Sequence, residues 1–263
     1  MSLEHISEHE LNRLTKDLHE MHLDEGLPAM EQAAQELTEA SRPGVGRARS
    51  SRRTFLLGVG ASVAGGAVLA ACSSSAPSTS SPMSSSGTAL TGDLQVAGMA
   101  ASLENLAVDT YQSAISAAQG GHLGTVPPAV VTFAQTAKSQ HADHARAWNA
   151  ILLQAGKQPV RSPDPVLKPT VDQALAKVTD VPGVAKLALM LENVAAQTYQ
   201  AGVGALASPA AVRTAATIQP VEMQHAAILY FVLGEYPGIQ DANGTPLAFN
   251  PTDLARPASD YRG

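Results

Sequence analysis

The sequence has few cysteines, few aromatic residues and few charges. A single cysteine among 263 residues excludes an internal disulfide framework. Aromatic residues make up 4% and the net charge is −6, so the basic, aromatic surface that binds nucleic acid is missing and no nucleic-acid partner is expected. Charged residues make up 15% of this chain, against about 25% in an average soluble domain. Because 44% of the residues are hydrophobic, the chain can still bury a core.

The few charges are unevenly distributed along the chain. Residues 1–40 carry ten Asp or Glu and four of the eight histidines, whereas residues 41–53 carry five arginines and no acid. Residues 54–92 carry no charge at all. A basic stretch followed by an apolar run and then small residues is typical of an export signal.

Two motifs border the apolar run. The sequence SRRTFL at residues 51–56 resembles the twin-arginine export motif, with Arg52 and Arg53 as the pair. The sequence LAAC at residues 69–72 resembles the bacterial lipobox. This resemblance implies recognition by the twin-arginine export machinery, cleavage before Cys72 and attachment of lipid to that cysteine. The mature protein would be anchored to the membrane, on the outer side of the cytoplasmic membrane or in the cell envelope.

An alternative interpretation of the apolar run is an uncleaved transmembrane helix over residues 55–71. That run has 17 residues and four glycines, whereas a span needs about 20 apolar residues. The segment that follows, residues 73–92, is dominated by Ser, Pro, Thr and Gly and is expected to be a flexible tether.

The leader of residues 1–50, acidic and then basic, is interpreted as disordered or as a short amphipathic helix. The helical reading depends on four apolar residues at helical spacing: Leu11, Leu14, Leu18 and Met21. Such a helix could bind a cytoplasmic partner before cleavage; alternatively, translation starts at Met21 or Met30. The four histidines of the leader are interpreted as solvated side chains rather than metal ligands: His5, His9, His19 and His22.

An internal repeat organises the rest of the chain. LENLAVDTYQ at residues 103–112 and LENVAAQTYQ at residues 191–200 share seven of ten positions. Each copy lies in an Ala-rich helical stretch, followed by a Gly or Pro break and a second helix, over residues 128–154 and 209–233. A Pro-rich connection with a short helix near 171–178 joins the two hairpins. The expected fold is an all-α four-helix bundle with one long crossover, over residues 93–235, followed by a Pro-containing tail over residues 236–263 that is extended or loose.

Six potential ligands fall at one height of this bundle. Within each hairpin, the acidic residue of the first helix and the ligand-type residues of the second are equidistant from the turn. The six are Glu104, His141, His144, Glu192, Glu222 and His225. A carboxylate in a bundle core is costly unless it is paired or binds a metal. Oxygen and imidazole ligands together suit Fe, Mn or Zn.

The domain resembles the ferritin-like superfamily of carboxylate-bridged di-iron bundles. That family places one Glu on each first helix and Glu-x-x-His on each second helix, and the matching residues are Glu104, Glu192, Glu222, His225 and His144. Each first-helix Glu is followed two turns later by a tyrosine, Tyr111 or Tyr199, which the resemblance assigns to the surroundings of the metal ligands.

One position departs from the family pattern. The family has a metal-bridging Glu where this chain has His141, and a neutral imidazole cannot bridge two irons. The site is therefore either a mixed His/Glu centre with one or two metals or a degenerate site without metal. Together with the export motifs, the resemblance implies an envelope lipoprotein that oxidises or handles iron, with oxygen or peroxide as oxidant. The alternative is a non-catalytic bundle that binds a partner or ligand.

Overall fold

The computed structural model describes residues 6–40, 92–235 and 252–261. Within these ranges the secondary structure is helical and no strand occurs. The arginine pair Arg52 and Arg53, the apolar run, Cys72 and the tether lie outside the described residues. Among the residues that are described, no helix combines the length and the apolar character that crossing a membrane requires.

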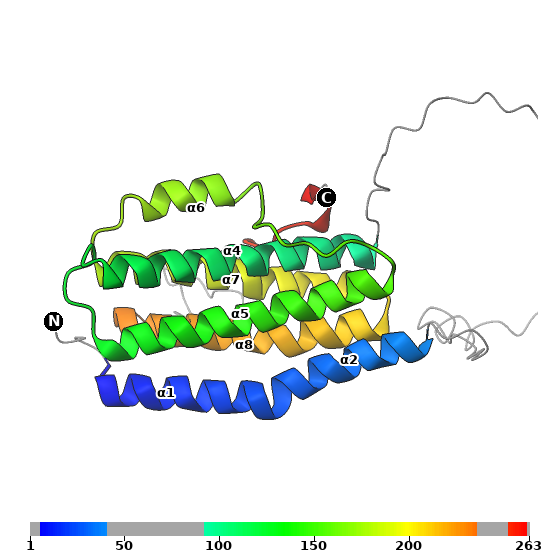
Figure 1. Ribbon diagram of the computed structural model, residues 1–263, viewed down its shortest axis with the longest axis horizontal. Coiled ribbons are helices and arrows are strands. Elements are labelled where there is room, and N and C mark those ends of the chain that lie inside the picture. Colours follow the sequence, from blue (N-terminus) through cyan, green and yellow to red (C-terminus); the bar gives the residue numbers. More distant parts are fainter. Residues whose placement is uncertain (1–5, 41–91, 236–251, 262–263) are drawn as a thin grey trace, which may run out of the picture. The chain divides into compact units, whose positions relative to one another are not determined.

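Two helical hairpins form a four-helix bundle, as the repeat predicts (Figure 1). Their helices are α4 (Asp93–Gln119) with α5 (Pro128–Gln154), and α7 (Val181–Ala205) with α8 (Pro209–Leu233). Proline opens α5 and α8, where its missing N–H costs nothing. The Asp180 carboxylate caps α7 by accepting the Gly183 N–H at 2.8 Å. Gly234 ends α8 with a left-handed φ of 68°.

The crossover between the hairpins contains the short helix α6 (Lys168–Leu175). It begins three residues before the position expected from the sequence. The buried Asp164 carboxylate accepts the N–H groups of Val166 and Leu167, while the Asp164 N–H donates to the Ser102 carbonyl at 2.9 Å. These bonds fix the connection against α4, so that Leu167 lies beside the centre of the bundle.

Two apolar clusters fill the bundle, one toward each end. Phe133 and Leu229 belong to one cluster, and Trp148 and Ile218 belong to the other. Burying a large apolar side chain contributes about 1.5–3 kcal/mol. On α4, α5 and α7 the potential ligands lie between the two clusters in sequence position, so apolar side chains pack on both sides of the polar layer.

The N-terminal segment, residues 6–40, packs on the bundle instead of standing apart from it. It consists of α1 (Glu8–Met21), a π-helical turn (His22–Gly26) and α2 (Leu27–Ala40). The segment runs along α5 and α8 (Figure 1). Leu11 and Leu18 are 0% and 3% exposed, because the apolar stripe of α1 faces the bundle.

The interpretation of the leader histidines as solvated is wrong for His22, which is 2% exposed. Its ring is buried because the π-helical turn contacts α8, and its Nε2 lies 3.0 Å from Asp143 Oδ2 on α5. His9 and His19 are exposed, as expected, and His5 lies outside the described residues.

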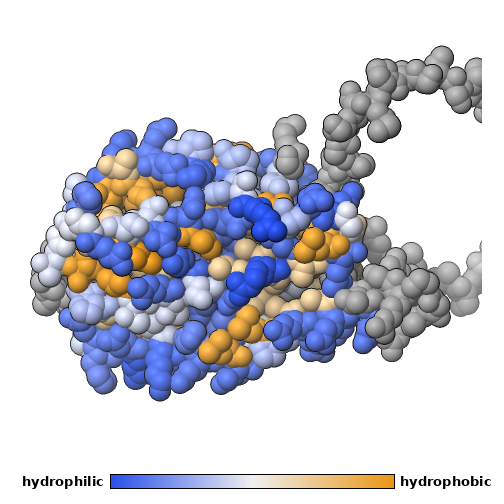
Figure 2. All heavy atoms as spheres, viewed as in Figure 1, coloured by the Kyte–Doolittle hydropathy of each residue, from blue (hydrophilic) through white to orange (hydrophobic). Residues whose placement is uncertain are grey.

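The described part of the C-terminal tail, residues 252–261, lies against α7. Leu254 donates its N–H to Gln197 Oε1, and Arg256 donates its N–H to Thr198 Oγ1, both at 2.8 Å. Large exposed apolar side chains such as Leu153, Val166 and Met190 sit on different elements. The face drawn in Figure 2 is accordingly a mosaic of hydrophilic and small apolar areas.

Candidate metal centre

All six potential ligands meet in one buried layer. Glu104 comes from α4 and Glu192 from α7, whereas α5 and α8 each contribute two residues one turn apart. None of the six side chains is more than 2% exposed. The helical register inferred from the hairpin midpoints therefore matches the observed placement.

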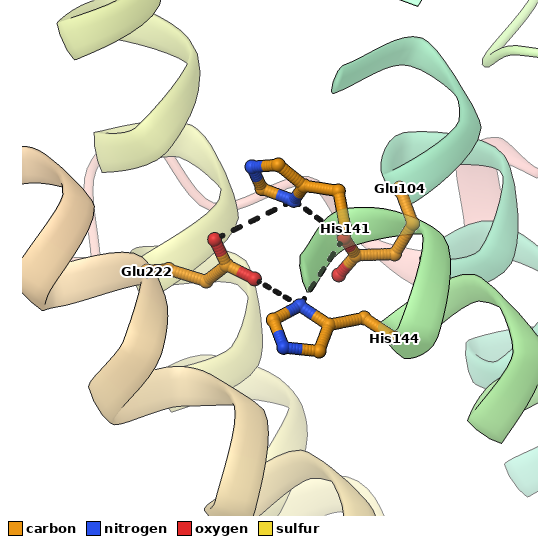
Figure 3. A group of neighbouring side chains, drawn as sticks. All are labelled: Glu104, His141, His144 and Glu222. Carbon is orange, nitrogen blue, oxygen red and sulfur yellow. Dashed lines mark hydrogen bonds and ion pairs between the residues drawn. The ribbon is translucent and has the colours of Figure 1, made fainter. Parts of the chain in front are cut away.

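The six side chains form two overlapping groups of four. One group contains Glu104, His141, His144 and Glu222 (Figure 3), and the other contains His141, Glu192, Glu222 and His225. Within each group the potential ligand atoms all lie within 4.8 Å of one another. His141 and Glu222 belong to both groups, so the layer has two adjacent positions at which a cation could be held.

Glu222 turns one carboxylate oxygen toward each group. Its Oε1 lies 2.8 Å from His144 Nδ1, and its Oε2 lies 3.3 Å from His225 Nδ1. A carboxylate in this orientation can contribute one oxygen to each of two metal ions. Glu222 thus has the geometry of a bridging ligand.

His141 lies between the two carboxylates of the first helices. Its Nδ1 is 2.7 Å from Glu104 Oε2, and its Nε2 is 3.1 Å from Glu192 Oε1. The ring also stacks on Tyr111, with centroids 5.7 Å apart. An imidazolium in this position donates to both carboxylates, and this links α4 to α7 through α5.

The two repeat tyrosines cross over to the opposite copy of the repeat. Tyr111 on α4 donates its hydroxyl hydrogen to Glu192 Oε1 on α7 at 2.5 Å. Tyr199 on α7 donates to Glu104 Oε1 on α4, and Trp148 Nε1 donates to the Tyr199 oxygen at 2.8 Å. Each first-helix carboxylate therefore has one oxygen held by a tyrosine. The other oxygen of Glu104 faces His141 and His144, and the other oxygen of Glu192 faces His225, while His141 also contacts the tyrosine-held Oε1 of Glu192.

Acids and imidazoles shift each other's pKa in opposite directions. Burial raises the pKa of Glu104, but the charge of His144 and a hydrogen bond from His141 outweigh it and lower that pKa to about 2. Burial lowers the pKa of His144, but Glu222 and Glu104 raise it to about 9. The pKa of Glu192 is likewise lowered, despite burial, by His141 and His225.

The pKa values of His141 and His225 are raised in the same way. Burial lowers the pKa of His141, but the charges of Glu222 and Glu192 raise it well above 6.5. The pKa of His225 is also raised, by Glu192 above all, against burial. The shifts of these acids and imidazoles all favour the charged forms, so opposite charges within the layer stabilise one another.

The donor set fits a transition metal, and one contact in particular favours it. His144 Nδ1 and Glu222 Oε1 are only 2.8 Å apart, yet neither atom has a partner with hydrogen-bond geometry among the described residues. An imidazole nitrogen and a carboxylate oxygen that both face one point are suited to a shared cation once the ring has released its proton. Buried polar atoms without a partner are otherwise costly.

A family model described as a ferritin-like domain matches residues 92–235, which is more than half of the chain. The chain belongs to the ferritin-like family. No curated protein and no solved structure gave a significant match. The ferritin-like domain coincides with the described bundle, from the start of α4 to the residue after Gly234.

A small cavity reaches the layer from the α4–α7 side of the ferritin-like domain. Its volume is about 30 Å³, and Glu104, His141 and Glu192 line it on the inside. Apolar side chains, including Ala107 and Leu167, make up most of the remaining wall. A cavity of this size has room for molecules of about the size of water.

Sequence reasoning missed two residues that support the layer. Gln140 Oε1 lies 2.7 Å from His225 Nε2, and His22 packs against His144 with ring centroids 5.4 Å apart. No motif marks Gln140. His22 was missed because the leader was not expected to touch the bundle, although its position after Leu11 and Leu18 continues the apolar stripe of α1.

Proposed function

We propose that this ferritin-like protein binds a transition metal, Fe, Mn or Zn, in the six-residue layer. One position would be held by Glu104, His144 and Glu222, and the other by Glu192, His225 and Glu222, with His141 completing one of them. The observation that carries this proposal is Glu222, whose two oxygens face the two groups separately.

Ligation in this layer requires protons to leave. A histidine binds metal only as the neutral ring, so the imidazolium groups whose pKa is raised must release protons as the metal binds. Tyr111 and Tyr199 keep their protons, because burial first of all, and the neighbouring glutamates next, raise their pKa well above 10. They can therefore hold Glu192 and Glu104 by hydrogen bonds in both the empty and the loaded site.

The chemistry proposed for the loaded site is the oxidation of Fe(II) with oxygen or peroxide as oxidant. The apolar side chains on both sides of the polar layer exclude bulk water. The small cavity beside Glu104 and Glu192 has room for a small molecule such as the oxidant. The carboxylates supply the negative charge that favours the more highly charged Fe(III) product.

We also propose that the protein works in the cell envelope as a lipoprotein. The support is the order of Arg52, Arg53, the apolar run and Cys72 in the sequence. The twin-arginine export machinery carries folded proteins, so the centre could be loaded before export. Loss of membrane association in Cys72→Ser, together with cytoplasmic retention of an Arg52→Lys/Arg53→Lys variant, is the expected result of cell fractionation.

A second candidate is a metal-free bundle that binds a partner or ligand in the envelope. The observation that favours it is the charge balance of the layer, in which His141 donates to both Glu104 and Glu192 and takes the place of a bridging cation.

Metal analysis of the purified full chain separates the two candidates. We expect one or two bound metal ions per chain, which Glu192→Ala loses in part or in whole. Glu235→Ala is the matched control, because Glu235 is exposed and lies beyond α8. A folded full chain that binds no Fe, Mn or Zn would refute the metal-centre proposal and leave the second candidate.

A further inference from the structure

The N-terminal segment covers the outer side of His144. The His22 ring lies 5.4 Å from the His144 ring, at an interplanar angle of 60°. His22 Nε2 lies 3.0 Å from Asp143 Oδ2, on the residue before His144 in α5. The Asp143 carboxylate thereby anchors a leader side chain directly beside a potential metal ligand.

The same segment reaches His225 through Gln140. Gln140 donates its amide N–H to the Leu18 carbonyl at 3.4 Å, and its Oε1 lies 2.7 Å from His225 Nε2. The backbone carbonyl can only accept, so the Gln140 nitrogen must face it and the Gln140 oxygen must face His225. His225 Nε2 then carries a hydrogen, and its Nδ1 is directed toward Glu192 and Glu222.

The backbone of the N-terminal segment changes its geometry where the segment crosses the six-residue layer. The π-helical turn His22–Gly26 interrupts the segment at the point where it crosses the layer, and such turns are frequent at functional sites. A Cβ atom on Gly26 would lie 3.2 Å from His22 Nδ1, so glycine leaves room for the ring. Buried Leu11 and Leu18 hold the segment on the bundle before the turn, and Arg213 pairs with Glu36 at 3.1 Å after it.

We propose that residues 6–40 form a detachable cover that closes the α5–α8 side of the metal centre, with His22 and Gln140 as positioning residues for His144 and His225. This inference rests on the proposed metal binding. With the cover removed, His144 loses its contact with His22, and Gln140 loses the Leu18 carbonyl that orients it toward His225, so metal exchanges faster.

The proposed lipoprotein processing would act on the connection between cover and bundle. The Ala71–Cys72 peptide bond lies in the chain between residues 40 and 92. Hydrolysis of that one bond would leave the cover attached only by its noncovalent contacts. Loading with the cover in place and release after its loss would then be separate stages.

The experiment uses the full chain with a site-specific protease sequence inserted within residues 73–92. The protein is loaded with Co²⁺, and release to excess chelator is followed by the visible absorption of Co²⁺, before cutting, after cutting and after removal of the cover by gel filtration. We expect release to be roughly 10- to 100-fold faster without the cover, the range that loss of outer contacts to metal ligands produces. The absorption spectrum should change as well.

Two other outcomes separate the two proposals. Equal release rates and equal spectra with and without the cover would overturn the cover and leave metal binding intact. An uncut, folded chain that takes up no Co²⁺ would overturn the proposed function itself. Should the cut segment stay bound, Leu11→Asp/Leu18→Asp is expected to release it, with Leu23→Asp as control because Leu23 is 46% exposed.

Point variants test the positioning residues without detaching the segment. His22→Ala is expected to release Co²⁺ roughly tenfold faster, whereas His19→Ala, exposed one turn earlier, should leave the rate unchanged. Gln140→Leu should alter the Co²⁺ spectrum, because His225 loses the acceptor for its Nε2–H. If both variants retain the rate and the spectrum at unchanged unfolding midpoints, the positioning role is wrong.

Discussion

The two sides of the polar layer are built by different means. On the α4–α7 side, the repeat supplies equivalent residues, so each glutamate is held by the tyrosine of the other copy. On the α5–α8 side the copies differ: His141 stands where Glu222 stands in the other hairpin, and the N-terminal segment closes the outer surface. The symmetric side thus supplies the two repeat glutamates, Glu104 and Glu192, whereas the asymmetric side supplies the carboxylate that faces both groups, Glu222, and is covered by the N-terminal segment.

The strongest test of this comparison is Glu222→Ala. Because Glu222 contributes to both groups, we expect both metal positions to be lost, whereas Glu104→Ala should remove one position only. Removing one partner of a buried charge network also costs about 3–5 kcal/mol in unfolding free energy. Metal stoichiometry and denaturant unfolding measure the two effects.

The result that would contradict this expectation is equal metal content in Glu222→Ala and Glu235→Ala. Such a result would mean that Glu222 is not a ligand of either metal position, and that the α5–α8 side does not supply a bridging carboxylate.

Metal affinity is expected to rise steeply with pH. The pKa of His144 is raised to about 9, so below that pH a proton must be displaced for every His144 that binds metal. Affinity should therefore increase by at least about tenfold per pH unit from pH 7 to about 9, because His144 alone releases one proton and any other imidazolium that becomes a ligand releases another. Competition with a chelator of known affinity measures how metal affinity changes with pH, provided that the chelator's affinity is corrected for its own protonation at each pH.

A flat profile over that range would show that His144 is already neutral in the metal-free protein. Burial would then dominate over the attraction of Glu222 and Glu104, and the charge balance described for the layer would be wrong.

The two tyrosines should differ in their effect despite their equivalent places in the repeat. Tyr111→Phe removes one hydrogen bond to a buried carboxylate, worth about 1.5–3 kcal/mol. Tyr199→Phe removes the equivalent bond and also leaves Trp148 Nε1 without its acceptor, so we expect it to be more destabilising by about 1–3 kcal/mol. Urea unfolding followed by the fluorescence of Trp148, the single tryptophan, compares them. Equal losses would indicate that the Trp148 contact contributes nothing.

The helices and the register within each hairpin are determined by local sequence patterns, so they could be predicted from the sequence. The repeat and its breaks located α5 and α8 at their observed bounds, and the hairpin midpoints placed Glu104 level with His141 and His144. Helical rise is constant, so equal distance from a turn means equal height. The two hairpins, and the common level of the potential ligands within each hairpin, follow from that.

Contacts between distant segments could not be predicted in the same way. The spacing of Leu11 and Leu18 predicts an apolar face but not what covers it, and nothing in it links His22 to Asp143, 121 residues away. The crossing of Tyr111 to Glu192 likewise depends on how the two hairpins face each other. Such contacts are decided by the packing of whole helices.

The smallest expected effect concerns the cavity on the α4–α7 side. Ala107 lines this cavity, and Ala107→Val would fill part of its volume of about 30 Å³ without touching a ligand. We expect unchanged metal affinity but a few-fold slower oxidation of Fe(II), because the oxidant reaches Glu104 and Glu192 through a narrower opening. Ala117→Val on the same helix, outside the cavity, is the matched control. If Ala107→Val and Ala117→Val react equally fast while removal of the N-terminal segment accelerates the reaction, the oxidant arrives from the α5–α8 side, and the cavity on the α4–α7 side is not its route.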